Sequence, residues 1–412
     1  MNRTILHSDM NCFYASVEMM LNPELQGKAV AVCGSTENRH GIVLAKSEKA
    51  KQAGIKTGMV NWEAKRLCPD LILVSPQYEQ YLKYSNMARE IYQEYTDLVE
   101  PYGMDECFLD VTASQVLYGS GKEIADQIRC RMKNELGLTV SIGISFNKIF
   151  AKLGSDMKKP DAITSIEESE WKQKVWPLRV SELLFCGRST TKKLEQVGIY
   201  TIGDLAEMDH DYVNQLLGKN GLMLWSYANG LDDSPVMEKD FVSPMKSVGH
   251  GITCTADLKT EEEAWKVILE LCQDIGHRLR IHGLKAQGVQ IAIRSQELFI
   301  RQYQGQLSLL TIVPLEIAKL ARELFQRNYD WKEPVRSVTV RAINLVSAKE
   351  PEQICLFSDP IRLEKEEKLF LAIEEIRRRF GKRAIYPAAL MKDLKMPEYR
   401  DHGLIMPGVM NR

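Results

Sequence analysis

Two adjacent carboxylates interrupt an apolar stretch of this sequence. Asp105 and Glu106 lie within MDECFLDV (104–111), whose other residues read mostly as a buried strand. Burying two neighbouring carboxylates is costly unless positive charge lies beside them. The fold must therefore bring a cation to this strand or expose the pair in a turn. From this segment alone a turn stays the alternative, because PYG (101–103) before it is turn-like.

A third acid ends the first strand expected in the chain. RTILHSD (3–9) has the pattern of a short strand that closes on Asp9. If this strand lies beside 104–112 in one sheet, Asp9, Asp105 and Glu106 converge. Mg²⁺ is the hard, oxygen-binding cation that usually relieves such repulsion. Two ions about 3.5–4 Å apart can bridge the attacking and leaving oxygens of a phosphoryl transfer, so the cluster points to that chemistry.

A lysine-rich segment follows a third expected strand at 138–144. The segment GISFNKIFAKLGSDMKKPD (143–161) contains four lysines: Lys148, Lys152, Lys158 and Lys159. Lysines beside a carboxylate–metal centre would offset the charge of a triphosphate. A solvated basic helix face is the alternative. The chain has no G-x-x-x-x-G-K-[ST] loop, which argues against a P-loop enzyme.

The chain is long enough, at 412 residues, for two to four domains. Expected strands and helices alternate up to about 166, with a long helix expected at 78–99, and short helical pieces fill 167–231. The stretch 232–247 has two prolines and no periodicity, and a second alternating unit spans about 248–346. We therefore expect an α/β (α+β) multidomain protein.

The composition excludes several classes. No stretch of 18 apolar residues occurs, so no membrane span is expected. The nine cysteines form no C-x-x-C or Cys/His cluster, which is typical of reduced cytosolic thiols. The net charge of −1 argues against nonspecific coating of nucleic acid but leaves local basic surfaces open.

Three segments together resemble the Y-family (DinB/UmuC) translesion DNA polymerases. They are DMNCFYASVE (9–18), MDECFLD (104–110) and the lysine-rich segment 143–161. Their order and spacing fit the family, and GIVLAKSEKAKQAGIKTGM (41–59) looks most like its UmuC-like Gram-positive branch. The resemblance implies error-prone DNA-directed DNA synthesis past damaged bases, in the SOS response, by a monomer at the nucleoid of a bacterial cytoplasm.

The resemblance also implies the architecture of a right-hand polymerase, with palm, fingers, a helix-hairpin-helix thumb and an α/β little finger. The implied boundaries are 1–12 and 74–166 for the palm, 13–73 for the fingers, 167–234 for the thumb, 235–244 for a linker, 245–346 for the little finger and 347–412 for a C-terminal tail.

The metal site follows from the same resemblance. Asp9, Asp105 and Glu106, with the backbone carbonyl of Met10, would hold two Mg²⁺ ions and would be the catalytic residues.

The nucleotide site is also implied by the family. Tyr14 falls at the steric gate, whose ring excludes a 2′-hydroxyl, and Phe13 would pack beside it. Lys51 and Lys159 would contact the triphosphate of the dNTP. The chain departs from the family at Glu48, where a tyrosine is frequent; this carboxylate would repel a triphosphate, so we give it no binding role.

The expected thumb contains a hairpin pattern. LLFCGRSTTKKLEQVG (183–198) resembles the family's helix-hairpin-helix, which aims backbone N–H groups at a DNA phosphate. Gly187 matches its second glycine, Phe185 replaces the first, and Lys192 and Lys193 add charge. An ordinary helical turn is the alternative.

A second basic segment lies in the expected little finger. IGHRLRIHGLKAQGVQIAIRSQ (275–296) has no acid and four Lys or Arg residues: Arg278, Arg280, Lys285 and Arg294. We expect these residues to contact duplex DNA, with a solvated sheet face as the alternative.

The tail contains a short peptide pattern. EQICLFSD (352–359) resembles the sliding-clamp-binding peptide of bacterial polymerases, with Gln353, Leu356 and Phe357 as anchors. QLSLL (306–310) is a near match that we expect between a strand and a helix, within a folded region.

Two other function classes stay open at this stage. One is a nucleotide cyclase with a palm-like catalytic domain, and the other is a catalytically silent DNA- or clamp-binding protein. The leading hypothesis is a translesion polymerase whose partners are primer–template DNA, dNTPs and a sliding clamp.

Overall fold

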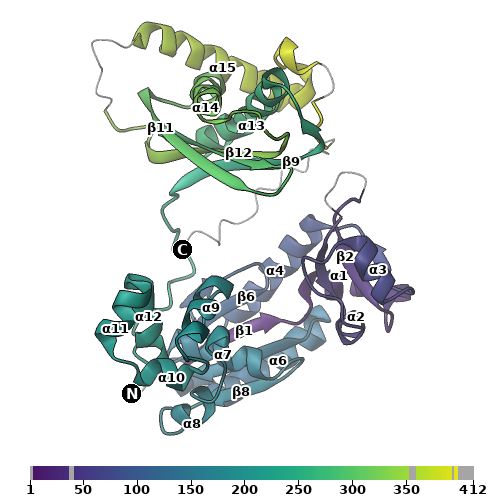
Figure 1. Ribbon diagram of the computed structural model, residues 1–412. Helices are drawn as coiled ribbons and strands as arrows, with labels where there is room; N and C mark the ends of the chain where they lie inside the picture. The colour runs from purple at the N-terminus through teal and green to yellow at the C-terminus, as the bar shows by residue number, and fades with distance from the viewer. Residues whose placement is uncertain (1–2, 37–40, 352–358, 392–393, 398–412) are drawn as a thin grey trace.

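The computed structural model describes residues 3–36, 41–351, 359–391 and 394–397. It is a mixed α/β architecture, as the sequence predicts, with one sheet-and-helix unit formed by the C-terminal part of the chain and the rest gathered in a second body (Figure 1). No helix among the described residues is long and apolar enough to cross a membrane.

A five-stranded sheet forms the centre of the N-terminal part. Its strands in spatial order are β5 (Val99–Pro101), β6 (Glu106–Asp110), β1 (Ile5–Met10), β7 (Val140–Ser145) and β8 (Ile163–Ile166). The expected neighbours 3–9 and 104–112 are adjacent and antiparallel, with Asp9 opposite Glu106. The segments that carry the acids therefore meet at one end of two central strands.

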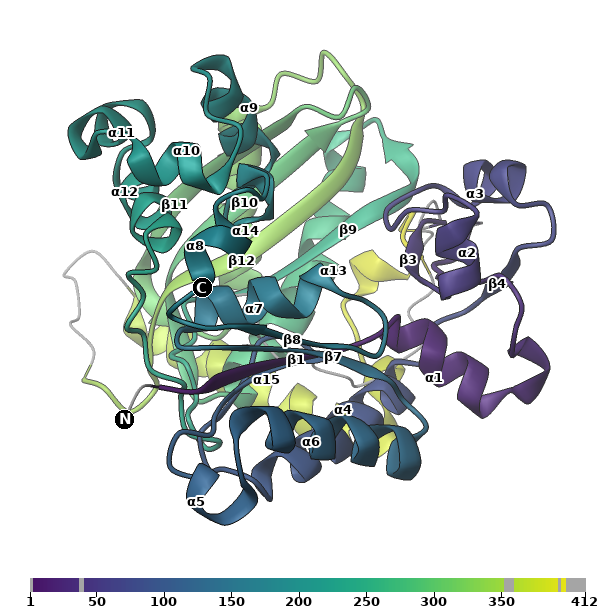
Figure 2. The same ribbon diagram turned by 90° about the horizontal axis from the view of Figure 1, so that it is seen from below.

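Helices cover both faces of this sheet. Helices α4 (Tyr78–Gln93) and α6 (Gly121–Leu136) lie on one face and α7 (Lys148–Met157) on the other (Figure 2). Helix α7 approaches β7 closely, because a side chain at Gly143 would collide with the helix backbone, 1.9 Å from the Ala151 carbonyl oxygen. Gly154 lies on the facing side of α7. This close approach brings the lysines of α7 over the end of β1.

The expected helix at 78–99 is too long. Helix α4 ends at Gln93, and the chain then turns into β5, an edge strand that the sequence interpretation did not predict.

The expected fingers contain a small three-stranded sheet. Its strands in spatial order are β3 (Val43–Lys46), β2 (Val30–Cys33) and β4 (Ile72–Val74). The helices around it are α1 (Phe13–Leu21), α2 (Glu48–Gln52) and α3 (Asn61–Leu67).

Short helices form the expected thumb. They are α8 (Trp171–Val175), α9 (Arg188–Gln196), α10 (Ile202–Glu207), α11 (His210–Leu217) and α12 (Lys219–Ala228). Their apolar faces share one core with the buried face of α7, so this helical group is anchored on the palm.

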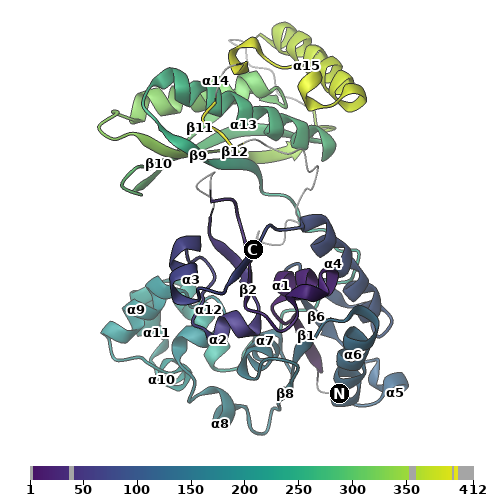
Figure 3. The ribbon, with the colours of Figure 1, turned by 90° about the vertical axis from the view of Figure 1, so that its right-hand side faces the viewer.

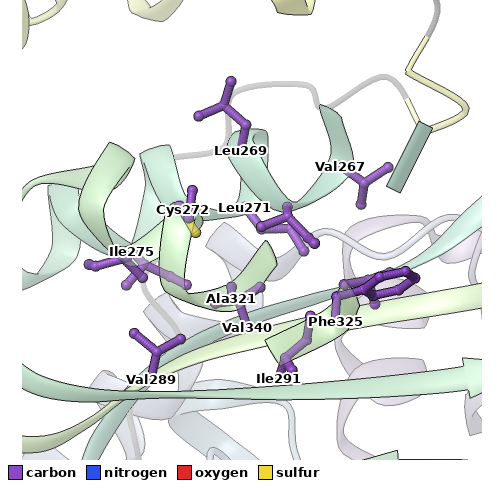
Figure 4. Packing of buried hydrophobic residues seen from close by; sticks show 14 of the residues in the cluster. Val267, Leu269, Leu271, Cys272, Ile275, Val289, Ile291, Ala321, Phe325 and Val340 are labelled. Carbon is purple, nitrogen blue, oxygen red and sulfur yellow. The ribbon is translucent and has the colours of Figure 1, made fainter. Parts of the chain in front are cut away.

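The expected little finger is a four-stranded antiparallel sheet with helices on one face (Figure 3). The strands in spatial order are β11 (Ile300–Thr311), β10 (Leu284–Ser295), β12 (Val335–Ser347) and β9 (Ser247–Leu258), and the helices are α13 (Glu261–Ile281) and α14 (Pro314–Asn328). Side chains from both layers interlock in its core, including Ile291 and Val340 of the sheet with Leu271 and Phe325 of the helices (Figure 4).

The first half of the expected linker lies along the palm. Val236 is buried against Ile5 and Phe108. Polar contacts fix the backbone on both sides of it: Arg3 Nη2 to Ser234 O at 2.8 Å, Lys148 Nζ to Pro235 O at 3.3 Å, and Met237 N to Glu100 Oε2 at 3.0 Å.

The C-terminal tail contains a long helix, α15 (Pro360–Phe380). It buries Leu363, Phe370 and Glu374, and Phe370 joins the core of the little finger. The tail helix is therefore packed on this domain.

Candidate active site

The pleat of β1 sorts its residues between the two faces of the palm sheet. His7 and Asp9 point toward α7, where they contact Ser155 and Lys152, respectively. Ser8 points to the other face and contacts Tyr92 of α4. Glu106, opposite Asp9, shares the α7 face, so two of the three expected metal ligands adjoin Lys152 of that helix.

Asp105 lies just before β6, next to the end of β1. Its backbone carbonyl accepts a hydrogen bond from the Met10 amide at 3.0 Å. Asp9, Met10, Asp105 and Glu106 are thus brought together, as predicted, from segments almost 100 residues apart in the chain.

Two lysines neutralise part of this acidic cluster. Lys152 Nζ lies 2.9 Å from Glu106 Oε1 and 3.4 Å from Asp9 Oδ2. Lys159 Nζ lies 2.7 Å from Asp9 Oδ2 and also pairs with Asp156 at 2.8 Å. Of the two, only Lys159 was assigned to the triphosphate by the sequence; Lys152 is the closer companion of Glu106.

The three carboxylates titrate differently because their surroundings differ. Burial raises the pKa of Asp9 against the opposing effect of Lys159 and Lys152. Burial would also raise the pKa of Glu106, but His7 and Lys152 outweigh it and hold that pKa below its ordinary value. Burial, followed by the charges of Asp9 and Glu106, raises the pKa of Asp105 to about 6. Negative charge thus remains in excess around Asp105.

The donor chemistry of the cluster fits a hard cation. Among the described residues no three His, Cys, Asp or Glu side chains lie together in a metal-binding arrangement, and the lysines hold the nearest oxygens of Asp9 and Glu106. The buried carboxylates are nevertheless the oxygen donors that Mg²⁺ takes. A divalent cation would offset the repulsion that raises the pKa of Asp105.

The two aromatic residues at the start of α1 differ in burial. Phe13 is 3% exposed and belongs to the palm core, whereas Tyr14 is only half-buried. The ring of Tyr14 stacks on Tyr81 at 4.2 Å between centroids with 10° between planes, and Tyr78 meets it edge-on. Its hydroxyl lies 3.4 Å from the sulfur of Met104, beside Asp105. The ring is therefore fixed next to the acidic cluster.

A buried carboxylate supports this aromatic stack. Glu18, 4% exposed, accepts hydrogen bonds from the Tyr81 hydroxyl and, at 2.7 Å, from Gln77 Nε2. Sequence reasoning missed Glu18 and Tyr81, because about 60 residues separate them and no local pattern joins them.

Helix α2 brings the fingers next to the loop after β1. The Cys12 thiol donates to Glu48 Oε1 at 3.2 Å, and Lys51 Nζ lies 3.6 Å from the same oxygen. Lys51 is therefore near the site but shares its charge with Glu48, and its contact with a triphosphate stays a prediction.

Phe185 replaces the first glycine of the expected thumb hairpin but keeps a backbone conformation typical of glycine. Phe185 has φ of 68°, in the left-handed region that favours glycine. Gly187 precedes α9, and Lys192 and Lys193 on that helix are exposed. Their contact with DNA stays a prediction.

Three of the four cations predicted in the little finger are engaged by acids of the domain or its tail helix. Arg278 lies 2.7 Å from Asp274, Arg280 lies 3.4 Å from Glu374, and Lys285 lies 3.5 Å from Glu367. A DNA-binding role for these three stays a prediction, but it would have to compete with these pairs.

Arg294 has a different position, on the helix-free face of the little-finger sheet. The strand register aligns Arg294 of β10 with Ile300 of β11 and Ser337 of β12, which together form one row of side chains across the sheet. The next rows along this face consist of polar or small residues. These rows contribute Gln290, Gln302, Gln304, Thr339 and Arg341. The sequence interpretation missed Arg341, although the alternation of polar and apolar residues along 335–342 marks it as opposite to the core.

The expected clamp-binding anchors Gln353, Leu356 and Phe357 lie outside the described residues. The near match at 306–310 was expected between a strand and a helix; that was wrong, because it lies within β11.

Comparisons with known proteins find relatives over most of the chain. Models of the impB/mucB/samB family and of its C-terminal domain match residues 8–156 and 245–356. A DNA polymerase IV of Acetivibrio thermocellus is 48% identical over 393 residues, covering 95% of this chain and 98% of that protein. DNA polymerase IV 1 of Bacillus subtilis is 38% identical over 393 residues, covering 95% of this chain and 94% of that protein.

A solved structure has the same fold. A Y-family DNA polymerase chimera superposes with a TM-score of 0.73 over 84% of this chain and 99% of the other, at 24% sequence identity.

Proposed function

This chain belongs to the impB/mucB/samB family, the Y-family DNA polymerases, and on that premise we propose that its palm cluster joins dNTPs to a primer 3′-hydroxyl with two Mg²⁺ ions. It is a metal-dependent, DNA-directed DNA polymerase of the translesion type. The observation that carries the proposed mechanism is the meeting of Asp9, Asp105 and Glu106 at one end of two paired strands. The closer likeness to the UmuC-like branch stays a prediction.

The chain's own residues have distinct tasks in this mechanism. Asp9, Asp105, Glu106 and the Met10 carbonyl would hold the ions, which when bound activate the primer hydroxyl and stabilise the charge of the leaving pyrophosphate. Lys159, at the flank of Asp9, would contact the triphosphate.

The stacked ring of Tyr14 would lie under the sugar of the incoming nucleotide. Because Tyr81 and Glu18 hold this ring, it cannot easily turn away from a 2′-hydroxyl. Phe13 supports the position from the core.

A primer-extension assay separates this function from the two alternatives. With Mg²⁺ and all four dNTPs, we expect extension of a primed template, both undamaged and with an abasic site. A nucleotide cyclase would instead release cyclic nucleotide from an NTP alone, and a catalytically silent binding protein would do neither. Either of these outcomes would contradict the proposal.

DNA would be gripped by the thumb hairpin and by the helix-free face of the little-finger sheet. The four central rows of that face contain arginines and side-chain amides but no acid. Such a surface can pair with and hydrogen-bond to the phosphates of DNA without repelling them. In Figure 1 it turns toward the body that contains the palm.

We also propose that residues 353–357 bind a sliding clamp. Their sequence supports this, and they follow the last strand of the little finger. Deleting these five residues should abolish stimulation by a clamp and leave unaided extension unchanged. Equal loss of both would contradict the assignment. We expect the polymerase to act as a monomer in the cytoplasm, at the nucleoid where its DNA substrate lies.

A further inference from the structure

His7 is a buried imidazole in the middle of the catalytic strand. Its side chain is fully buried on the α7 face of β1, two residues before Asp9. The ring packs edge-on against Phe108 at 4.6 Å between centroids. An imidazole in such surroundings needs partners for its nitrogens. The mechanism above gives His7 no task.

Its two nitrogens face two different functional elements. Nδ1 lies 2.8 Å from the hydroxyl of Ser155 on α7, and Nε2 lies 3.5 Å from Oε2 of Glu106 on β6. The other oxygen of Glu106, Oε1, lies 2.9 Å from Lys152 Nζ. The carboxylate is therefore bounded by His7 on one oxygen and by Lys152 on the other.

The contact with Glu106 determines where the ring carries its proton. A lone pair on Nε2 would repel the ionised carboxylate, so the N–H belongs on Nε2. Nδ1 can then accept from the Ser155 hydroxyl, which also lies 2.7 Å from the Lys152 carbonyl and can turn between the two acceptors. At 3.5 Å from Oε2, Nε2 is buried and forms no hydrogen bond among the described residues, and a small movement of Glu106 would give it this partner.

We propose that His7 is a positioning residue that holds Oε2 of Glu106 through Nε2–H, so that Oε1 is presented to the catalytic metal. A metal cation can replace the ammonium group of Lys152 at Oε1, whereas His7 stays fixed by Ser155 and by the sheet. The inference rests on the proposed role of Glu106 as a metal ligand. Groups that orient metal ligands in this way typically contribute about 10- to 100-fold to metal affinity.

Two substitutions separate the contacts of the ring. His7→Asn places an amide nitrogen near the position of Nδ1 and keeps the link to Ser155, while His7→Gln places one near Nε2 and keeps the link to Glu106. Binding of Mn²⁺ to the full chain with primed DNA, followed by electron paramagnetic resonance, gives the affinity without catalysis. We expect His7→Asn to weaken binding about tenfold or more, and His7→Gln to remain within about threefold of the unsubstituted chain. Equal affinity in all three proteins, or equal loss in both variants, would overturn the inference.

A Glu106→Gln variant distinguishes failure of this inference from failure of the mechanism. If Glu106→Gln binds Mn²⁺ as tightly as the unsubstituted chain, the metal role of Glu106 is wrong. If it loses binding while His7→Asn does not, only the role of His7 is wrong. Should His7→Asn fail to fold, ¹⁵N NMR of histidine side chains in the unsubstituted chain still decides: a proton on Nε2 supports the inference, and an unprotonated Nε2 overturns it.

Discussion

Asp105 has the least balanced charge of the three carboxylates that are predicted to hold metal. Asp9 and Glu106 each adjoin a lysine ammonium group, whereas Asp105 forms no ion pair with any residue that the structure describes. Its pKa of about 6 reflects burial and the charges of its two neighbours. The convergence of the three acids was predictable from the sequence, because each acid lies at the end of or within a recognisable strand pattern. Glu18, Tyr81 and His7 were not predicted, because their tasks arise from contacts between distant segments.

The stack beneath Tyr14 makes a prediction about sugar selection. Replacing Tyr14 by Ala removes the ring that would meet a 2′-hydroxyl, so incorporation of ribonucleotides relative to dNTPs should rise about 10- to 100-fold. Tyr14→Phe keeps the ring and should keep most of the discrimination. The measurement is steady-state incorporation of matched dNTP and NTP opposite one template base. An unchanged ratio in Tyr14→Ala would show that another residue forms the gate.

At the scale of elements, two glycines fix where Lys152 of α7 meets the acids. Gly143 and Gly154 allow helix and strand to approach closely, and the strand that contains Gly143 was predicted from the sequence. The end of α4 was not predicted, since its apolar spacing continues past Gln93 while the chain turns to pair with β6 as β5. Local spacing cannot show such a tertiary pairing.

Docking of α15 on the little finger depends on Glu374. This carboxylate is 4% exposed and meets His277, Arg280 and Arg377. Burial would raise its pKa, but these cations outweigh burial and lower it. Its stabilising effect is therefore complete above the ordinary glutamate pKa and is lost as the pH falls through the lower pKa of the folded state.

Glu374→Ala should loosen α15 by about 2 kcal/mol at neutral pH, because Arg377, with Arg280 and His277 beside it, loses a buried carboxylate partner. Hydrogen exchange of residues 360–380 measures this local opening. Glu375→Ala is the matched control, since Glu375 pairs with Arg378 and Arg379 at the surface. Faster exchange should occur only in Glu374→Ala, and the two chains should converge as the pH is lowered. Equal effects of both substitutions would show that α15 is held by apolar contacts alone.

At the scale of the whole molecule, the fold turns a sheet face, whose four central rows hold arginines and no acid, toward the body that contains the palm. The domain boundaries stay a prediction. The sequence did not predict which basic residues share the free face: Arg278, Arg280 and Lys285 instead pair with nearby acids. The connection between the bodies was expected to be a simple linker. Its first residues instead pack on the palm through Val236 and the buried Lys148–Glu100 ion pair at 2.7 Å.

This arrangement predicts which arginines contribute to DNA affinity. The double variant Arg294→Ala/Arg341→Ala should weaken binding to primer–template and reduce the slope of log K against log salt by about 2, one unit for each phosphate that is no longer neutralised. Arg327→Ala is the control, because this exposed residue of α14 pairs with Glu323. Fluorescence anisotropy at several salt concentrations measures both quantities. An unchanged slope in the double variant would show that DNA does not bind to this face.

The central claim is that Asp105 and Glu106, with Asp9, form the metal-dependent centre of DNA synthesis. Single-turnover primer extension at saturating Mg²⁺ and dNTP tests it most directly in Asp105→Asn and Glu106→Gln. Asp110→Asn is the control, because Asp110 lies at the opposite end of β6 from Glu106 and its carboxylate accepts hydrogen bonds from Thr112. We predict a loss of about a thousandfold or more in the rate for the first two variants, which corresponds to about 4 kcal/mol in the barrier, and little change for Asp110→Asn. Extension by either Asp105→Asn or Glu106→Gln within about tenfold of the unsubstituted rate would contradict the account.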